Sequence, residues 1–173
     1  AKASCACKAM RFVQLIFSPT GGVKRAAELL FAPIAEASEI VDLSLPLNGR
    51  PCFSAEDICL IAVPCFGGRV PEIALERLAQ TQGGGARAIL MSVYGNRSDE
   101  DTLFELKSAA KRAGYAPMAA VRAVAQHSIV PAIAAGRPDE EDARRLAQFG
   151  RVIRDRLAQK DAPPLSLAEK ELL

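Results

Sequence analysis

Short apolar runs alternate along this sequence with longer segments in which apolar residues recur every three or four positions. The short runs are rich in Val, Ile and Leu, and they predict strands over residues 11–17, 39–43, 58–63, 88–93 and 118–125. The longer segments predict helices over residues 22–32, 71–80 and 139–159, and a further helix from an acidic cap at 98–101 to Gly114. This alternation predicts an α/β fold, in which helices cover both faces of a parallel sheet.

The pattern alone is compatible with two strand orders, the doubly wound order 2-1-3-4-5 and a half-Rossmann order. In both, ligands bind beyond the carboxyl ends of the strands, beside the point where the strand order reverses. The loops after the first, third and fourth predicted strands are therefore the candidate site. Each contains glycine next to polar or aromatic residues: Ser18-Pro19-Thr20-Gly21-Gly22, Pro64-Cys65-Phe66-Gly67-Gly68-Arg69 and Tyr94-Gly95-Asn96-Arg97.

Length and charge narrow the class of protein. A chain of 173 residues suits one domain, which we place at residues 10–159, with an N-terminal extension at 1–9 and a C-terminal tail at 160–173. The net charge of +2 is small and the basic residues are scattered, which argues against nucleic-acid binding. We see neither an apolar stretch of the ~18–20 residues that a membrane helix needs nor the apolar core of a secretory signal. We therefore expect a cytoplasmic protein that does not bind membranes.

The cysteines do not predict a metal site or a disulfide framework. There are five, an odd number, and only Cys5 and Cys7 are close in sequence. Neither a second cysteine pair nor a histidine cluster accompanies them, so we predict that the protein holds no metal.

The first loop has the chemistry of a phosphate-binding turn. A strand that ends in Ser18-Pro19-Thr20-Gly21-Gly22 and leads into a helix gathers hydroxyls and backbone N–H groups around one point, at the positive end of the helix dipole. The ordinary alternative is a strand-to-helix turn with a Ser or Thr cap. The patterns G-x-x-x-x-G-K-[ST] and G-x-G-x-x-G are absent, no cysteine nucleophile lies near Ser18, and no acidic cluster follows the first and third strands.

These loops together resemble the flavodoxin family. The first is similar to the flavodoxin phosphate loop, Ser/Thr-x-Thr-Gly-x-Thr, and the ordered set resembles the flavodoxin-like module that is fused to bacterial-type ferredoxin domains. Residues 126–128 (Gln-His-Ser) and 136–139 (Gly-Arg-Pro-Asp) complete that set. The resemblance covers residues 12–157. It implies a flavodoxin-like three-layer sandwich with a five-stranded parallel sheet of order 2-1-3-4-5, and it implies flavin mononucleotide (FMN) as the cofactor.

The sequence departs from the family in four places. Val23 stands where flavodoxins often have a hydroxyl residue, and Phe66 stands where relatives often have Tyr. The chain has no Trp, and no cysteine follows His127, so the Cys run that binds iron–sulfur clusters is missing. The resemblance therefore implies a version without the iron–sulfur domain, whose electron partner is a separate protein such as a ferredoxin or a reductase.

Carried over to this chain, the resemblance assigns a role to each loop. The first loop and the Val23 amide hold the FMN phosphate, the second lies beside the flavin ring, Tyr94 lies against the ring face, and the residues after it contact the polar edge of the ring. Arg69 or Arg97 near the ring favours an anionic reduced flavin. His127 is a candidate for donating a proton or a hydrogen bond to the flavin or a substrate. The cofactor-binding set is Ser18, Thr20, Gly21, Gly22, Val23, Pro64, Phe66, Gly67, Gly68, Arg69, Tyr94, Gly95, Asn96 and Arg97.

Three functions remain open at this point. The first is electron transfer between redox partners through bound FMN, with no substrate pocket. The second is an FMN-dependent oxidoreductase that reduces a small molecule such as a quinone. The third is a flavin-free module that binds another phosphate ligand. The charge balance and the calculated pI of about 8.4 differ from the marked acidity of flavodoxins, which indicates either another kind of partner surface or a small-molecule substrate.

Overall fold

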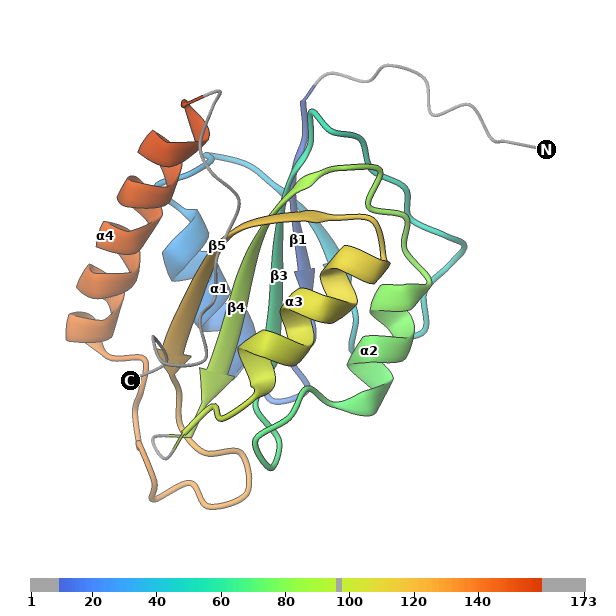
Figure 1. The fold of residues 1–173 in the computed structure, drawn as a ribbon. Helices are drawn as coiled ribbons and strands as arrows, with labels where there is room; N and C mark the ends of the chain where they lie inside the picture. Colours follow the sequence, from blue (N-terminus) through green and yellow to red (C-terminus); the bar gives the residue numbers. More distant parts are fainter. Residues whose placement is uncertain (1–9, 96–97, 160–173) are drawn as a thin grey trace.

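A computed structural model describes residues 10–95 and 98–159, so the predictions for residues 1–9, 160–173, Asn96 and Arg97 lie outside the described residues. Five strands and four helices alternate along the chain (Figure 1). Their bounds agree with the sequence pattern to within a few residues: β1 Phe12–Ile16, α1 Gly22–Phe31, β2 Glu39–Asp42, β3 Ile58–Pro64, α2 Glu72–Ala79, β4 Arg87–Tyr94, α3 Thr102–Arg112, β5 Ala116–Val124 and α4 Glu140–Leu157.

The sheet has the order β2-β1-β3-β4-β5 with every neighbouring pair parallel, which confirms the flavodoxin-like order over the half-Rossmann alternative. The order reverses between β1 and β3. The carboxyl ends of the strands lie together at the lower edge in Figure 1. This edge therefore gathers the loops on which the sequence placed its candidate site.

Helices cover both faces of the sheet. In the central strand β3, alternate side chains pack into the two apolar layers, one on each face. All residues of β3 are buried. Cys59, Ile61 and Val63 join the apolar layer that also contains Leu78 of α2 and Leu106 of α3. The alternate residues, 58, 60 and 62, join the layer under α1 and α4. A continuous apolar run is what a strand needs when both of its faces are covered.

The ends of two helices are fixed in different ways. Asp139 and Asp142 form a capping box at the start of α4, because each side chain accepts a hydrogen bond from the backbone N–H of the other. The predicted acidic cap of α3 does not form: Asp101 occupies the N-cap position without a side-chain hydrogen bond. Asp99 is instead buried against Arg122 of β5, with the Arg122 Nε 2.8 Å from a carboxylate oxygen. Asp99 therefore pairs with Arg122 and does not cap α3.

Two kinds of feature are absent from the described residues. No helix there is long and apolar enough to cross a membrane. No group of three or more His, Cys, Asp or Glu side chains within residues 10–95 and 98–159 is placed to hold a metal ion.

Candidate functional site

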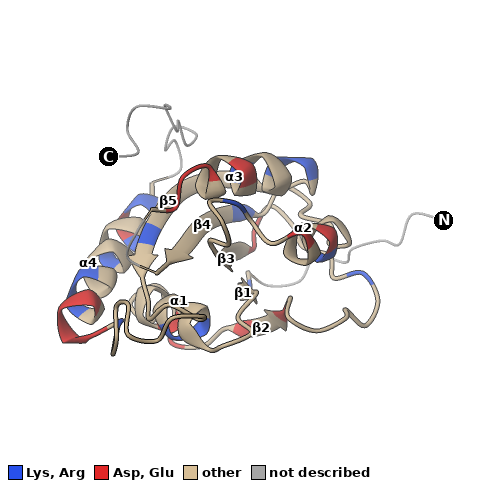
Figure 2. Ribbon diagram, turned by 90° about the horizontal axis from the view of Figure 1, so that it is seen from below, with Lys and Arg blue, Asp and Glu red and all other residues tan. Residues whose placement is uncertain are grey.

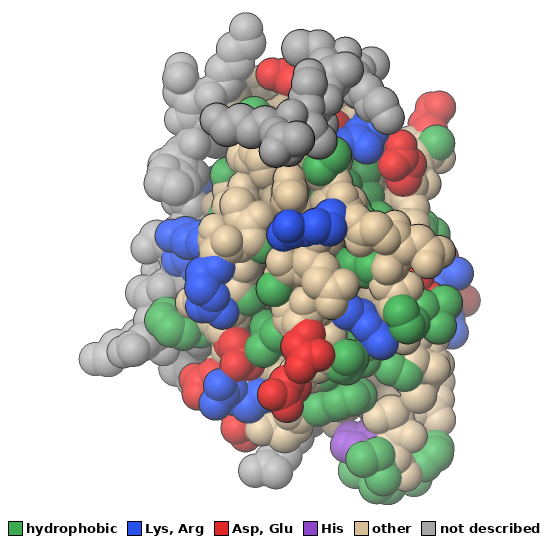
Figure 3. All heavy atoms as spheres, turned by 90° about the vertical axis from the view of Figure 1, so that its right-hand side faces the viewer, with side chains coloured by type: hydrophobic (Ala, Val, Ile, Leu, Met, Phe, Trp, Pro, Cys, Tyr) green, Lys and Arg blue, Asp and Glu red, His purple; other side chains and the backbone are tan. Residues whose placement is uncertain are grey.

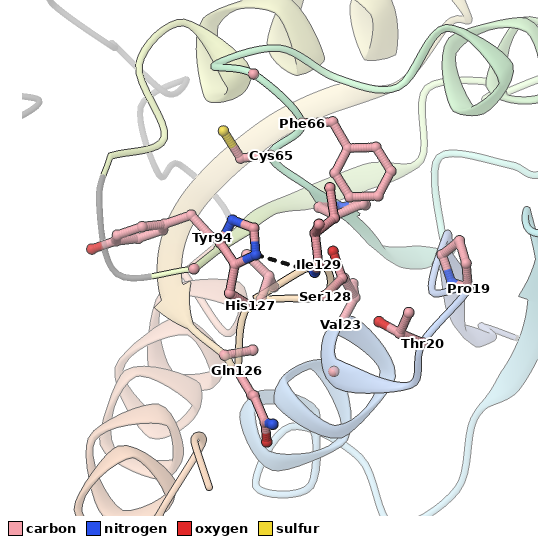
Figure 4. Close-up of a pocket in the computed structure, with 16 residues that line it drawn as sticks. Pro19, Thr20, Val23, Cys65, Phe66, Tyr94, Gln126, His127, Ser128 and Ile129 are labelled. Carbon is pink, nitrogen blue, oxygen red and sulfur yellow. Dashed lines mark hydrogen bonds between the residues drawn. The ribbon is translucent and has the colours of Figure 1, made fainter. Parts of the chain in front are cut away.

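A pocket of about 160 Å³ opens at the carboxyl edge of the sheet, where the loops after β1, β3, β4 and β5 meet (Figure 4). A more open hollow of about 370 Å³ adjoins it beside the start of α1, and the two share Thr20, Gly22 and residues 126–128. The pocket is lined by sixteen residues: Pro19, Thr20, Gly22, Val23, Pro64, Cys65, Phe66, Gly67, Val93, Tyr94, Gly95, Ala125, Gln126, His127, Ser128 and Ile129.

The wall of this pocket carries no formal charge from Lys, Arg, Asp or Glu in the part of the chain that the structure describes. Figure 2 looks onto this edge and shows the acidic and basic residues mainly on the helices. Phe66 and Ile129 stand at the mouth, with 47% and 83% of their surface exposed. The pocket therefore suits an uncharged, partly apolar group, and the negative charge of a phosphate would have to be met at the turn beside it.

That turn leaves three backbone N–H groups available. Gly21 adopts a left-handed conformation with φ of 86°, which favours glycine, and it occupies the N-cap position of α1. The N–H groups of Thr20, Gly22 and Val23 make no hydrogen bond within the described residues. Together they form a concave set of donors at the positive end of a ten-residue helix, which is the local chemistry of an anion site.

Ser18 makes two hydrogen bonds at this turn. Its hydroxyl oxygen accepts the backbone N–H of Lys24 at 3.0 Å, and its own N–H donates to the Ser44 hydroxyl at 2.7 Å. Ser18 is not among the residues that line the pocket. In this structure it closes the turn and holds it to the loop after β2, and Thr20 is the hydroxyl residue of this turn that lines the pocket.

The second loop divides into a part that faces the pocket and a part that faces α3. Pro64, Phe66 and Gly67 line the pocket, whereas Gly68 and Arg69 do not. A methyl group at Gly68 would lie 2.1 Å from a carboxylate oxygen of Glu100, so that side chain covers Gly68.

Arg69 lies outside the pocket because Glu105 of α3 holds it. Its Nη2 and Nε donate to the two Glu105 carboxylate oxygens at 2.6 and 3.2 Å, and the Val70 N–H donates to the same carboxylate at 2.8 Å. The hydrogen bond from Arg69 is the largest reason why the pKa of Glu105 is lowered. A role for Arg69 next to a ring has no support from this arrangement.

The third loop contributes Tyr94 and Gly95 to the pocket wall, and Asn96 and Arg97 lie outside the described residues. The Tyr94 hydroxyl points away from the pocket, so the base of its ring rather than its polar end faces the site (Figure 4). Gly95 lies against His127: a methyl group there would be 2.5 Å from the imidazole Cδ2. Glycine at position 95 is therefore required for this close approach.

The fourth loop, residues 126–138 after β5, forms the remaining wall. The sequence marked His127 as a candidate, and the structure places it in the pocket. Gln126, Ser128 and Ile129 also line the pocket but were not assigned to it in advance. An available signal was the apolar pair Ile129-Val130 directly after the polar residues 126–128. Figure 3 shows hydrophobic side chains gathered beside the histidine at this lower edge.

The cysteines near the sheet differ in accessibility. Cys59 is fully buried, and burial raises its pKa to about 12, which keeps it a thiol at neutral pH. Cys65 lies in the pocket wall with its Sγ 3.5 Å from the carbonyl oxygen of Ser98. Cys52 is exposed, and these three cysteines are not joined by disulfides.

The comparisons with known proteins agree with this architecture. No protein-family model matches the chain, and a search of curated proteins gave no match. Among solved structures, a flavodoxin from the domain Archaea has a TM-score of 0.51 and 11% identity over 87% of this chain and 99% of its own. The Flv1 flavodiiron core from Synechocystis sp. PCC6803 has a TM-score of 0.55 and 13% identity over 88% of this chain but only 37% of its own. Azoreductase AzrA has a TM-score of 0.50 and 12% identity over 88% of this chain and 100% of its own.

At these identities the likeness concerns the fold. The chain has the flavodoxin-like α/β fold, which the strand order shows independently. Its structural neighbours include proteins described as flavodoxins and as an azoreductase.

Proposed function

We propose that this protein binds FMN at the carboxyl edge of its sheet and transfers electrons between redox partners. The observation that carries the proposal is the pairing of two environments. Three available backbone N–H groups at the 18–22 turn lie directly beside an uncharged pocket with apolar walls. FMN has the matching construction, with an anionic phosphate at one end and a planar, largely uncharged ring at the other.

The phosphate end would be held mainly by the backbone. The amides of Thr20, Gly22 and Val23 are the donors, and the Thr20 hydroxyl adds a further one. Val23 has an apolar side chain, so only its N–H takes part. Arg25 lines the open hollow beside this turn and supplies a positive charge at the surface.

The ring end would lie among residues of three loops. Pro64, Phe66 and Gly67 come from the second loop, Gly95 from the third, and residues 127–129 from the fourth. When bound, FMN supplies the capacity to accept and release electrons one or two at a time. The protein itself contributes binding, orientation and exclusion of water, and Phe66 and Ile129 at the mouth keep part of the site accessible to a partner. A ferredoxin or a reductase is the partner class that the sequence resemblance implies.

An alternative function is the reduction of a small molecule by an FMN-dependent oxidoreductase. The pocket wall favours it, because an apolar acceptor such as a quinone would meet no charged side chain among the described residues that line it. Steady-state oxidation of NAD(P)H by the FMN-loaded protein in the presence of a quinone separates the two functions. Robust turnover would replace the carrier proposal with the enzyme.

The first experiment is a titration of the flavin-free protein with FMN, followed by quenching of flavin fluorescence. We expect saturable binding at one site. Thr20→Glu should abolish it, because a carboxylate would be placed beside the phosphate, and Thr20→Val should weaken it only by removing one hydroxyl. Gln148→Glu, which adds the same charge on the exposed side of α4, is the matched control and should bind as the wild type does. A protein that does not bind FMN at all would leave the flavin-free module as the better description.

A further inference from the structure

His127 shapes the loop in which it stands. Its Nδ1 accepts two backbone hydrogen bonds, from the N–H of Ile129 and the N–H of Val130, each at 3.1 Å (Figure 4 shows one of them). A ring nitrogen can accept such hydrogen bonds only when it carries no proton, so this geometry corresponds to the neutral imidazole with its proton on Nε2. The side chain therefore acts as a local cap, in the way that Asn and Asp cap turns two and three residues ahead of themselves.

Hydrogen bonds from His127 and Gln126 also fix the rest of the loop. The His127 N–H donates to the Ile133 carbonyl oxygen at 3.0 Å. The Gln126 side chain donates to the Pro131 carbonyl oxygen at 3.0 Å and accepts the Gly136 N–H at 3.3 Å. The two ends of the loop are thus held together, and Figure 1 shows its course below the sheet. This course decides where Ile129 lies at the mouth of the pocket.

The imidazole also joins two loops of the site. Its Cδ2, Cβ and Cγ atoms lie so close to Gly95 that a methyl group there would be 2.5–3.0 Å from them. The ring is consequently packed on the third loop while its Nδ1 fixes the fourth. A change in the state of this one side chain would act on both walls of the pocket.

We propose that His127 is a positioning residue whose neutral form builds the outer wall of the pocket, so that its protonation opens residues 128–133 and weakens cofactor binding. On protonation, Nδ1 becomes a donor that faces two N–H donors, and both hydrogen bonds are lost. The effect on the loop follows from the hydrogen bonds alone. The effect on affinity rests on the proposed function, because it requires FMN to be the ligand.

Among the described residues that line the two hollows, none would compensate a positive charge on the imidazole. The titratable and basic groups that share its two hollows are Cys65 and Tyr94 in the pocket, and Arg25 and Arg137 in the adjoining hollow. No carboxylate lines either hollow within the described residues. Arg137 is itself paired, because it donates two hydrogen bonds to the Asp142 carboxylate.

Amide hydrogen exchange tests the loop without any cofactor. In the flavin-free protein, the Ile129 and Val130 amides should be protected near pH 8, and their protection factors, corrected for the intrinsic pH dependence, should fall roughly tenfold by about pH 5. His127→Asn places an oxygen where Nδ1 stands and should keep the protection at both pH values. His127→Gln places its oxygen one bond further out and should lose the protection at both.

Each outcome decides the proposal. Protection in the wild type that does not change with pH, or equal protection in the Asn and Gln variants, would overturn it. If a variant does not fold, the pH dependence of the wild type alone remains decisive. FMN titrations of the same three proteins should follow the same order. Protonation of the FMN phosphate, whose second pKa is about 6, lowers the affinity of all three in acid, and only the wild type should show an additional loss. Loss of loop protection together with unchanged FMN affinity would reject the link to binding, whereas absence of any FMN binding would reject the proposed function and leave the loop result standing.

Discussion

Gly150 of α4 packs directly against the backbone carbonyl oxygen of Leu30 in α1. A methyl group at position 150 would lie 2.3 Å from that oxygen and 2.6 Å from the Pro33 Cγ, and Gly150 is buried. The contact joins two helices with a direct relation to the site. The helix α1 begins at the phosphate-type turn, and α4 begins immediately after the 126–138 loop.

We expect Gly150→Ala to destabilise the protein, although alanine is the better helix former. Helix propensity alone would stabilise the variant by about 1 kcal/mol, but the added methyl group meets backbone and a proline ring, which forces the helices apart and costs roughly 1–3 kcal/mol. Urea unfolding followed by circular dichroism measures the difference. Gln148→Ala, at an exposed position on the same helix, should change the free energy of unfolding by less than about 0.5 kcal/mol. Greater stability in Gly150→Ala would contradict the described packing of α1 against α4.

Gly95→Ala should disturb the site through His127 and not through backbone strain, since Gly95 has no left-handed conformation. The methyl group would displace the imidazole, and we expect roughly tenfold weaker FMN binding together with loss of amide protection at Ile129. A double-mutant cycle with His127→Ala isolates the cause. In the His127→Ala background the methyl group meets no ring, so Gly95→Ala should then have little further effect. Equal effects in both backgrounds would show that the contact with His127 is not responsible.

The two exposed arginines near the site should behave differently. Arg69 is held by Glu105 outside the pocket, so Arg69→Met should leave the FMN dissociation constant within about threefold of the wild-type value. Arg25 lines the hollow beside the 18–22 turn, and Arg25→Met should weaken FMN binding by about three- to tenfold at low salt and by less at high salt. Titrations at two ionic strengths compare them. A larger effect for Arg69 would restore the role that the sequence resemblance gave it.

Asp57, at the opposite edge of the sheet, should govern part of the acid stability. Its carboxylate is buried, which by itself raises the pKa, but hydrogen bonds from Arg11 and from the Ser54 N–H outweigh burial and hold the pKa below the ordinary 3.8. A lowered pKa in the folded state means that this stabilisation is complete above about pH 4 and is lost as the pH falls through the folded value. We expect Asp57→Asn to cost roughly 2–4 kcal/mol at neutral pH and progressively less in acid. Urea titrations from pH 7 downward measure this.

The Asp57 prediction has a matched control in the same cluster. Glu39 is an exposed second partner of Arg11, at 3.8 Å from its Nη1. Glu39→Gln should therefore change the free energy of unfolding by less than about 1 kcal/mol. A pH-independent cost in Asp57→Asn would mean that lost packing, and not the charge of Asp57, explains its effect.

The fold could be predicted well from the sequence because the spacing of apolar residues identifies its strands and helices. A run such as residues 58–63 has no polar interruption and has the length that is typical of a strand covered on both faces, and the helical segments show their apolar stripes directly. The choice between the two strand orders needed the resemblance to flavodoxins, because periodicity does not say which strands are neighbours. The positions of Thr20, Phe66 and Gly95 at one edge then followed from the parallel order.

The roles of individual polar side chains were less predictable, since they depend on partners distant in sequence. Arg69 pairs with Glu105, which is 36 residues away, and Asp99 pairs with Arg122 across the loop and helix between them. Ser18 bonds within its own turn, although the same hydroxyl would suit a phosphate. The two hydrogen bonds to His127 Nδ1 require a particular backbone conformation at residues 127–130. Residue propensities do not predict that conformation.

The floor of the pocket is also the outer surface of the hydrophobic core. Val23, Val93 and Ala125 line the pocket and belong to the apolar layer between the sheet and α1 and α4. A ligand seated there would remain in contact with the folded core and have no equivalent place on the unfolded chain. Occupancy should therefore raise the melting temperature, with about 2.7 kcal/mol of added stability at a ligand concentration one hundred times the dissociation constant. A thermal-shift screen can thus rank flavins, nucleotides and quinones against each other without a reaction assay.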